Sequence, residues 1–407
     1  MIHICYGLYD RDGHYSKFVG TSMASVFENT QEDVTVHILH DNTLTGDNRD
    51  KFIYLVGKYG RHVEFYNVET LANDQVEQFK SNLPSVLQSE YSIATLYRLL
   101  MPKLILPSVS RIIYLDADIL VNLDIAELWE TKLLGLPAAV VPEHLIDIGF
   151  NIAKPYKYLL TSGLVKEEEY FNAGVLLFDL EYLRNNDAVL ADGYKFLCEH
   201  PQCKYFDQDI LNYCFAARSV KLPAKFDQFV ITERLSKNPR PIMRTIYHYT
   251  GNSIQLDLNE RFNRLYFEYF VKTPWLDINA LGNVFKAVDA VNKMKQNALL
   301  GVIRLIGKKK RAFFIEEKNI PVFRALFEIA DNELIIDASN SDALMKMVDA
   351  LKTRKTVCFI ISGNYSGFRN FLLSQHFVEG TDFIDALSFV SGFLGIQTES
   401  HSIVRAM

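Results

Sequence analysis

The 407-residue chain has few cysteines, and their spacing indicates neither a zinc site nor a disulfide framework. The five are odd in number, and neighbouring ones lack the C-x-x-C spacing of metal or redox sites; they are Cys5, Cys198, Cys203, Cys214 and Cys358. We therefore expect reduced thiols, as in a cytoplasmic protein.

Long apolar runs are also missing. The N-terminal stretch Met1–Gly7 has neither the basic region nor the apolar core of a signal peptide. No uninterrupted apolar run approaches the length needed to span a bilayer. We expect a soluble protein that is cytoplasmic, or at most peripheral on the inner face of the membrane.

An excess of basic residues is absent as well. The chain has 43 Lys and Arg against 49 Asp and Glu, a net charge of −6, so nucleic acid is not an expected partner. Hydrophobic residues make up 49% and charged residues 23%, which is typical of a globular protein. The length allows one large domain with a smaller one, or two to three domains.

The first seventy residues alternate between strand-like and helix-like segments. Ile2–Gly7, Val34–Asp41 and Val63–Val68 read as strands, and Tyr15–Glu28 and Asp47–Tyr59 read as helices. Such alternation with short connections predicts an α/β fold with a mixed, mostly parallel sheet. Ligands of such sheets bind at the carboxyl ends of the strands.

The run Arg111–Val121 is apolar except for two carboxylates, Asp116 and Asp118. Read as a buried strand, it places both on the same side, because strand side chains alternate between faces. Burying unpaired charge costs several kcal/mol, so we interpret the pair as ligands of a divalent cation that holds a phosphate ester. The alternative, that the two acids cap a helix or face solvent, stays open.

Six further residues are candidates for the same site. His248 would add an imidazole to the metal, and Gly251 would let backbone approach a phosphate. The remaining candidates are Asn172, Asp207, Gln208 and Arg98. The structural alternatives stay open: a structural histidine for His248, a turn in the sheet for Asn172–Gly174, helix-capping acids for the segment at Asp207, and a solvated helix arginine for Arg98.

In this order the motifs resemble those of glycosyltransferase family 8, above all the bacterial lipopolysaccharide galactosyl- and glucosyltransferases, and more distantly glycogenin. The likeness covers residues 1–275. The motifs are Tyr91-Ser-Ile-Ala-Thr95-x-x-Arg98, Tyr114-Leu-Asp116-Ala-Asp118, Tyr170-Phe-Asn172-Ala-Gly174, Asp207-Gln208-Asp209-x-Leu-Asn212 and His248-Tyr-Thr-Gly251.

The resemblance implies a GT-A fold that binds a UDP-sugar and a metal ion. Asp116, Asp118 and His248 would bind Mn²⁺, with Mg²⁺ as the alternative. Nucleotide and donor contacts would come from Asp10, Ser92, Thr95, Arg98, Ala117 and Gly251 as well as the two acids. The catalytic candidates are Gln208, close to the anomeric carbon, Asp207, which orients sugar hydroxyls, and Asn172.

Three positions depart from the family pattern. No lysine follows Gly251, where relatives use one to contact the diphosphate. Glu143 stands where relatives often have an aspartate. The first loop does not have the usual Ala-x-Asp-x-Asn form, and the uridine contact would come from Asp10 or Asp12.

We expect three segments: a GT-A catalytic domain at 1–275, a basic helical linker at 276–311, and a small α/β unit at 312–407 for acceptor binding or assembly. Residues 282–311 carry eight Lys and Arg against one acid, Asp289. With apolar residues between them, 293–311 suit peripheral contact with an anionic membrane. A solvated linker helix is the alternative.

The predicted function is Mn²⁺-dependent, retaining transfer of galactose or glucose. The donor would be UDP-galactose or UDP-glucose, and the acceptor a glycan on a glycoprotein, lipid or surface polysaccharide. Two alternatives stay open. One is a catalytically silent protein that binds sugar nucleotides or glycans, and the other is a self-glycosylating initiator like glycogenin.

Overall fold

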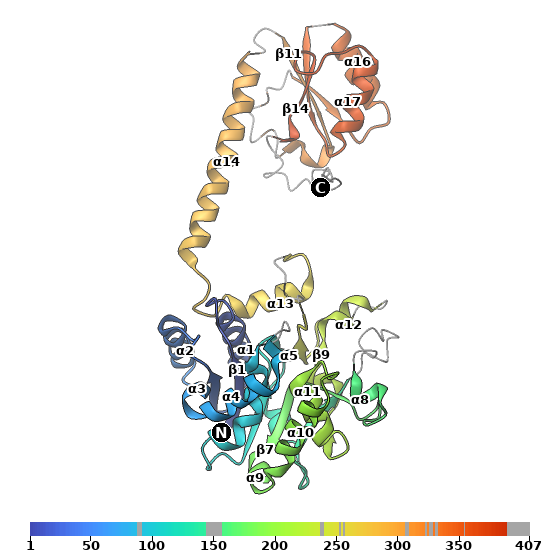
Figure 1. Ribbon diagram of the computed structural model, residues 1–407. Coiled ribbons are helices and arrows are strands. Elements are labelled where there is room, and N and C mark those ends of the chain that lie inside the picture. Colours follow the sequence, from blue (N-terminus) through green and yellow to red (C-terminus); the bar gives the residue numbers. More distant parts are fainter. Residues whose placement is uncertain are drawn as a thin grey trace. The chain divides into compact units, whose positions relative to one another are not determined.

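The structure, a computed structural model, divides into two compact units, Met1–Leu276 and Asp277–Met407 (Figure 1). It describes residues 1–87, 92–143, 157–236, 240–251, 254, 257–305, 309–321, 324, 329, 333–353 and 355–388.

A seven-stranded sheet forms the centre of the first unit, in the order β3-β2-β1-β4-β7-β6-β8. Strand β7 runs antiparallel to both neighbours, and the other neighbouring pairs are parallel. The α/β architecture with a mixed, mostly parallel sheet is therefore confirmed. The strands are β1 (Ile2–Leu8), β2 (Val34–His40), β3 (His62–Asn67), β4 (Arg111–Leu115), β6 (Ala138–Pro142), β7 (Phe171–Asp179) and β8 (Ser219–Lys221).

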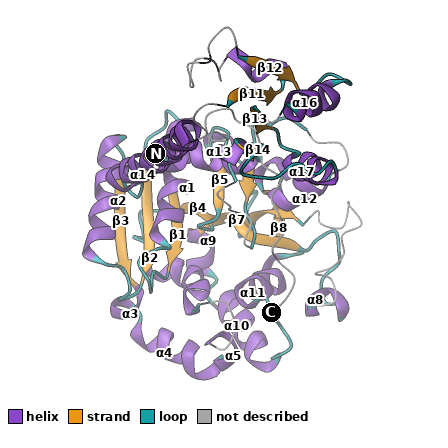
Figure 2. Cartoon of the chain, turned by 90° about the horizontal axis from the view of Figure 1, so that it is seen from above, coloured by secondary structure: helices purple, strands orange, loops and turns teal. Residues whose placement is uncertain are grey.

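Helices cover both faces of this sheet, as Figure 2 shows. Because strand side chains alternate, Tyr6 of β1 belongs to the core that includes Met23, whereas the adjacent Cys5 belongs to the opposite core with Leu96. The helical segments of the unit are α1 (Ser16–Asn29), α2 (Gly46–Lys58), α3 (Val68–Leu71), α4 (Asn73–Asn82), α5 (Pro84–Leu87), η1 (Ile93–Leu100), α6 (Met101–Leu104), α7 (Ala126–Trp129), α8 (Tyr158–Thr161), α9 (Leu180–Asn185), α10 (Ala188–Glu199), α11 (Phe206–Phe215), η4 (Ala224–Phe226), α12 (Val230–Leu235) and α13 (Arg261–Phe270).

A three-stranded sheet, in the order β5-β10-β9, completes the unit. It contains β5 (Ile119–Val121), β9 (Gln228–Phe229) and β10 (Ile246–His248). The prediction of one continuous strand over Arg111–Val121 is wrong. The chain turns at Asp116–Asp118, leaves the large sheet after β4 and enters the small sheet as β5, which keeps both carboxylates out of a sheet interior.

The second unit contains a four-stranded parallel sheet in the order β12-β11-β13-β14. Its strands are β11 (Lys310–Ile315), β12 (Leu334–Asp337), β13 (Thr356–Ile361) and β14 (Phe383–Asp385), and its helical segments include α14 (Ile278–Leu305), η5 (Glu317–Asn319), α16 (Ala343–Lys352) and α17 (Tyr365–Ser374). Strand β11 begins two residues before the expected start of the small α/β unit at 312.

The basic segment 293–311 falls partly outside the described residues, because many of its side chains and residues 306–308 are not described. Of its C-terminal cations, Lys309 lies near Asp382 and Arg311 pairs with Glu333. Among the described helices, none combines the length and the apolar character needed to cross a membrane.

Candidate functional site

A pocket of about 940 Å³ lies in the first unit, at the carboxyl ends of several strands of the large sheet. Its volume is that of a site for a ligand of nucleotide-sugar size. All but one of the predicted site residues line it: Ser92, Thr95, Arg98, Asp116, Ala117, Asp118, Asn172, Asp207, Gln208, His248 and Gly251.

Asp116, Asp118 and His248 form a cluster in which the possible ligand atoms lie within 4.8 Å of one another. The turn after β4 carries both acids, and the pairing of β10 with β5 sets His248 opposite Ile119, next to Asp118. Two carboxylates and one imidazole are a donor set that suits Mn²⁺, and they leave room for phosphate oxygens as further ligands. The residues present therefore fit a divalent metal ion.

His248 is held between two carboxylates. Its Nδ1 lies 2.9 Å from Oδ1 of Asp227, and its Nε2 lies 3.3 Å from Oδ1 of Asp118. Burial by itself lowers the pKa of His248, but Asp118 and Asp227 outweigh it and raise the pKa well above 6.5. The surroundings thus favour positive charge at this imidazole, as expected of a cation site. Sequence reasoning missed Asp227, because it belongs to no motif.

Gly174 of β7 packs against the ring of His248, and its lack of a side chain leaves room for the imidazole. A Cβ atom at this position would lie 2.3 Å from Cε1 of His248 and 2.9 Å from Oδ1 of Asn172. The imidazole of His248 occupies the space that a side chain at this position would need.

Arg98 connects the metal cluster to the predicted donor-sugar residues. Its Nη2 donates to Oδ1 of Asp116 at 2.7 Å, its Nε lies 3.0 Å from Oδ2 of Asp207, and its Nη1 donates to the carbonyl of Ala173 at 2.6 Å. The guanidinium also stacks on the ring of Tyr114. It is buried, so the interpretation as a solvated arginine does not hold.

A network of hydrogen bonds fixes the side chain of Gln208 at the start of α11. Its Oε1 accepts from Nδ2 of Asn172 and from the amide of Ala173, both at 3.1 Å, and its Nε2 donates to the hydroxyl of Tyr170 at 3.0 Å. Nearby, Thr95 donates to Oδ1 of Asp207 at 2.5 Å. Burial raises the pKa of Asp207, and Arg98 opposes that rise.

Asp10 is the predicted site residue that does not reach the pocket. It is fully buried, and its carboxylate accepts hydrogen bonds from the amides of Tyr15 and Ser16 and from Nδ2 of Asn48. These contacts fix the loop before α1 and leave no oxygen directed at a ligand. Its neighbours Tyr9 and Arg11 line the pocket instead.

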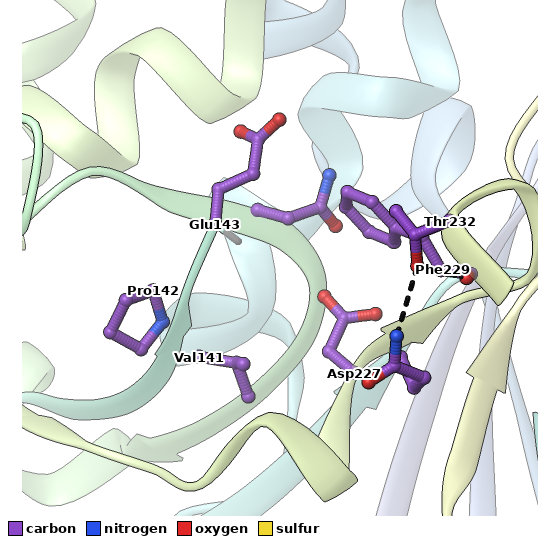
Figure 3. Close-up of a pocket in the computed structure, with 8 residues that line it drawn as sticks. Val141, Pro142, Glu143, Asp227, Phe229 and Thr232 are labelled. Atoms are coloured by element: carbon purple, nitrogen blue, oxygen red, sulfur yellow. Dashed lines mark hydrogen bonds between the residues drawn. The ribbon is translucent and has the colours of Figure 1, made fainter. Parts of the chain in front are cut away.

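Glu143 and Lys157 are two further charged residues that line the pocket. Lys157 was not recognised from the sequence, because no motif surrounds it. Glu143 also lines a separate cavity of about 20 Å³. In Figure 3, Glu143 lies on one side of this cavity and Asp227, Phe229 and Thr232 lie on the other.

Comparisons with known proteins agree with this geometry. Residues 7–253 match the family described as Glycosyl transferase family 8. The chain is 24% identical to General stress protein A of Bacillus subtilis over 67% of this chain and 94% of that protein. It is 27% identical to the lipopolysaccharide 1,3-galactosyltransferase of Salmonella typhimurium over 61% of this chain and 71% of that protein.

A solved structure of the galactosyltransferase LgtC, in complex with donor and acceptor sugar analogues, superposes with a TM-score of 0.53 at 19% identity. It covers 69% of this chain and 99% of that chain, and the likeness shows that the first unit has the GT-A fold. Because the family match extends over more than half of the sequence, the chain belongs to glycosyl transferase family 8 and is a glycosyltransferase.

Proposed function

We propose that this glycosyltransferase moves glucose or galactose from UDP-glucose or UDP-galactose to a glycan acceptor, with Mn²⁺ and with retention of anomeric configuration. The observation that carries the proposal is the cluster of Asp116, Asp118 and His248 in the wall of a pocket large enough for a nucleotide sugar. When bound there, the metal ion would neutralise charge that develops on the departing diphosphate.

The surrounding residues would orient the donor. Arg98 holds the carboxylates of Asp116 and Asp207 at fixed positions, so the metal ligand and a sugar-orienting residue cannot move independently. Gln208 has its amide oxygen saturated by two donors, which fixes the side chain beside the predicted position of the anomeric carbon. Such preorganised polar groups lower a barrier without reorganising during the reaction.

Release of UDP tests the proposal. The purified protein with Mn²⁺ and UDP-glucose or UDP-galactose is expected to release UDP slowly, by donor hydrolysis, and EDTA should stop it. The double substitution Asp116→Asn, Asp118→Asn should abolish both release and metal-dependent UDP binding. Asp50→Asn, at an exposed position on α2, is the matched control. If the double variant retained both activities, the metal assignment would be wrong.

The silent alternative has one observation in its favour, because no lysine follows Gly251 in the sequence. Tight UDP-sugar binding without UDP release from any donor would establish it. A self-glycosylating initiator would instead show hexose adducts on its own intact mass after incubation with the donor.

The acceptor side of the proposal rests on the relatives. One of them is named as a lipopolysaccharide 1,3-galactosyltransferase, and we propose a glycan on a lipid, glycoprotein or surface polysaccharide as the acceptor here. Residues 312–407 would contribute acceptor binding or assembly, and 293–311 peripheral membrane contact. Cosedimentation of the intact protein with anionic vesicles at low salt tests the membrane contact, and its failure would remove that part.

A further inference from the structure

Four arginine and lysine side chains line the large pocket, and carboxylates already compensate the charge of three of them. The fourth, Arg11, is exposed and forms no ion pair in the part of the chain that the structure describes. It can therefore meet an anionic group of a ligand without giving up a partner, and a lone cation in a cleft attracts such a group. The compensated cations are Arg98 with Asp116 and Asp207, Lys80 with Glu69 and Glu77, and Lys157 with Glu143.

The loop between β1 and α1 holds Arg11 in a tight turn. The amide of Gly13 donates to the carbonyl of Asp10 at 2.9 Å, which closes a four-residue turn with Arg11 at its second position. Gly13 has a φ of 73°, a left-handed conformation that glycine adopts without strain. The buried carboxylate of Asp10 connects the turn to the start of α1 by accepting from the amide of Tyr15 at 2.7 Å. Asp10 therefore positions the turn, and Arg11, the next residue, reaches the pocket.

Along the edge of the large sheet, the loop of Arg11 and the sugar-orienting residues lie on opposite sides of the metal cluster. β1 is a parallel neighbour of β4, so the loop after β1 begins at the edge where β4 leads into Asp116 and Asp118. β7 is the opposite neighbour of β4 and runs antiparallel to it, so its second residue, Asn172, lies at the same edge. A donor with its sugar at Asn172 and its diphosphate at the metal cluster therefore extends toward Arg11 with its nucleotide end.

The diphosphate needs more positive charge than the metal cluster supplies. The carboxylates of Asp116 and Asp118 balance the charge of a divalent ion, so the occupied cluster brings little net positive charge. During transfer the bond from the anomeric carbon to the β-phosphate oxygen breaks, and its electron pair stays on that oxygen. The acceptor oxygen bonds to the anomeric carbon and gives up its proton, so UDP leaves with more negative charge than it had in the donor. No lysine follows Gly251 to meet this charge.

We propose that Arg11 binds the diphosphate of the donor from the nucleotide side and stabilises the departing UDP, in the role for which relatives use a lysine elsewhere in the chain. This inference rests on the proposed function and adds a phosphate-binding residue to the same site. A guanidinium presents parallel N–H donors that match phosphate oxygens. Because the side chain is exposed and without an ion pair, it turns toward the phosphates at no cost in broken contacts.

Binding measurements with uridine, UDP and UDP-glucose, each with Mn²⁺, test the proposal in Arg11→Gln and Arg11→Lys. Glutamine removes the charge and keeps a polar side chain, whereas lysine keeps the charge and removes the paired donors. The matched control is Arg264→Gln on α13, because Arg264 is likewise exposed, forms no ion pair with the described residues and lies outside the pocket.

In Arg11→Gln the affinity for UDP is expected to fall by about tenfold or more, the usual effect of losing a hydrogen bond between charged groups. The affinity for UDP-glucose should fall less, because its diphosphate carries less charge, and the affinity for uridine should stay within about twofold. Arg11→Lys should lie between Arg11→Gln and the wild type. The rate of UDP release at saturating UDP-glucose should also fall in Arg11→Gln, and Arg264→Gln should change none of these values.

Three results would overturn the proposal. They are an unchanged UDP affinity in Arg11→Gln, an equal loss of uridine and UDP affinity in that variant, and the same loss of UDP affinity in Arg264→Gln. Circular dichroism and the melting temperature show whether the variants fold like the wild type. Failure of the proposed function is distinguishable, because the wild-type protein itself would then bind no UDP with Mn²⁺.

Discussion

Nη2 of Arg98 donates to Oδ1 of Asp116 at 2.7 Å, so a predicted metal ligand is fixed by a buried guanidinium. The same guanidinium lies 3.0 Å from Asp207, on the side of the predicted transferred sugar. One cation therefore sets the separation between the metal and the sugar contacts. A planar group with several donors can do this, whereas a point charge cannot.

Arg98→Lys should reduce UDP release strongly while preserving the fold. Lysine keeps the charge but cannot reach Asp116, Asp207 and the carbonyl of Ala173 together. Losing two charge-assisted contacts in a buried site costs about 3 kcal/mol, which corresponds to roughly a hundredfold in turnover. Arg98→Ala should also lower the melting temperature, because it leaves two carboxylates without their cation. Wild-type turnover in Arg98→Lys would contradict this role.

Asp227→Asn should weaken Mn²⁺ binding without abolishing it. Asp227 contacts Nδ1 of His248 at 2.9 Å and so orients the ring and leaves Nε2 for the cation. Substitution of such outer partners typically costs about 10- to 100-fold in metal affinity. Titration of Mn²⁺ into the protein with UDP present measures the effect. UDP binding without metal should stay unchanged, and an unaltered Mn²⁺ affinity would show that His248 needs no such partner.

Gly174→Ala should also weaken metal binding, by displacing His248. The added Cβ would lie 2.3 Å from Cε1 of the ring, closer than any real contact, so the imidazole must shift from its place between Asp118 and Asp227. Overpacking of this kind costs about 1–3 kcal/mol, and if the displaced ring carries that cost, Mn²⁺ affinity should fall by about five- to 150-fold. Gly57→Ala, where the added atom meets open space, is the matched control. Equal Mn²⁺ affinity in both variants would refute the steric role of Gly174.

Much of the fold was predictable because short sequence patterns determine most of its strands and helices. The alternation of β1, α1, β2, α2 and β3 depends on local periodicity. The turn at Asp116–Asp118 was not predictable in the same way. Apolar residues on both sides imitate one strand, and the break arises because β5 pairs with β10, more than a hundred residues later in the chain.

In the site, too, local motifs predict some residues, whereas others depend on contacts between distant parts of the chain. The residues inside motifs, such as Asp118 and Gln208, do line the pocket. Asp227 and Lys157 lie outside any motif, and only the tertiary contacts with His248 and Glu143 reveal them. Asp10 shows the reverse, because a polar loop residue after a strand resembles a ligand contact but here serves the loop itself.

Asp209 of α11 gives a prediction about stability and pH. It is fully buried, and burial raises its pKa to about 6, against 3.8 for an ordinary aspartate. Between these two values the folded state binds more protons than the unfolded state, so this carboxyl makes the protein less stable as the pH rises from about 4 to about 6. Above that window the penalty is complete, and below it the penalty is absent.

Asp209→Asn removes the titrating group and keeps an oxygen that can accept from the amide of Tyr205. The variant should therefore gain stability relative to the wild type as the pH rises. The shift of about two pKa units corresponds to about 3 kcal/mol of unfolding free energy between pH 4 and pH 7. Urea unfolding of both proteins at several pH values measures it. Asp50→Asn, at an exposed position, should show a constant difference. If Asp209→Asn also showed a constant difference, the carboxyl would titrate normally despite its burial.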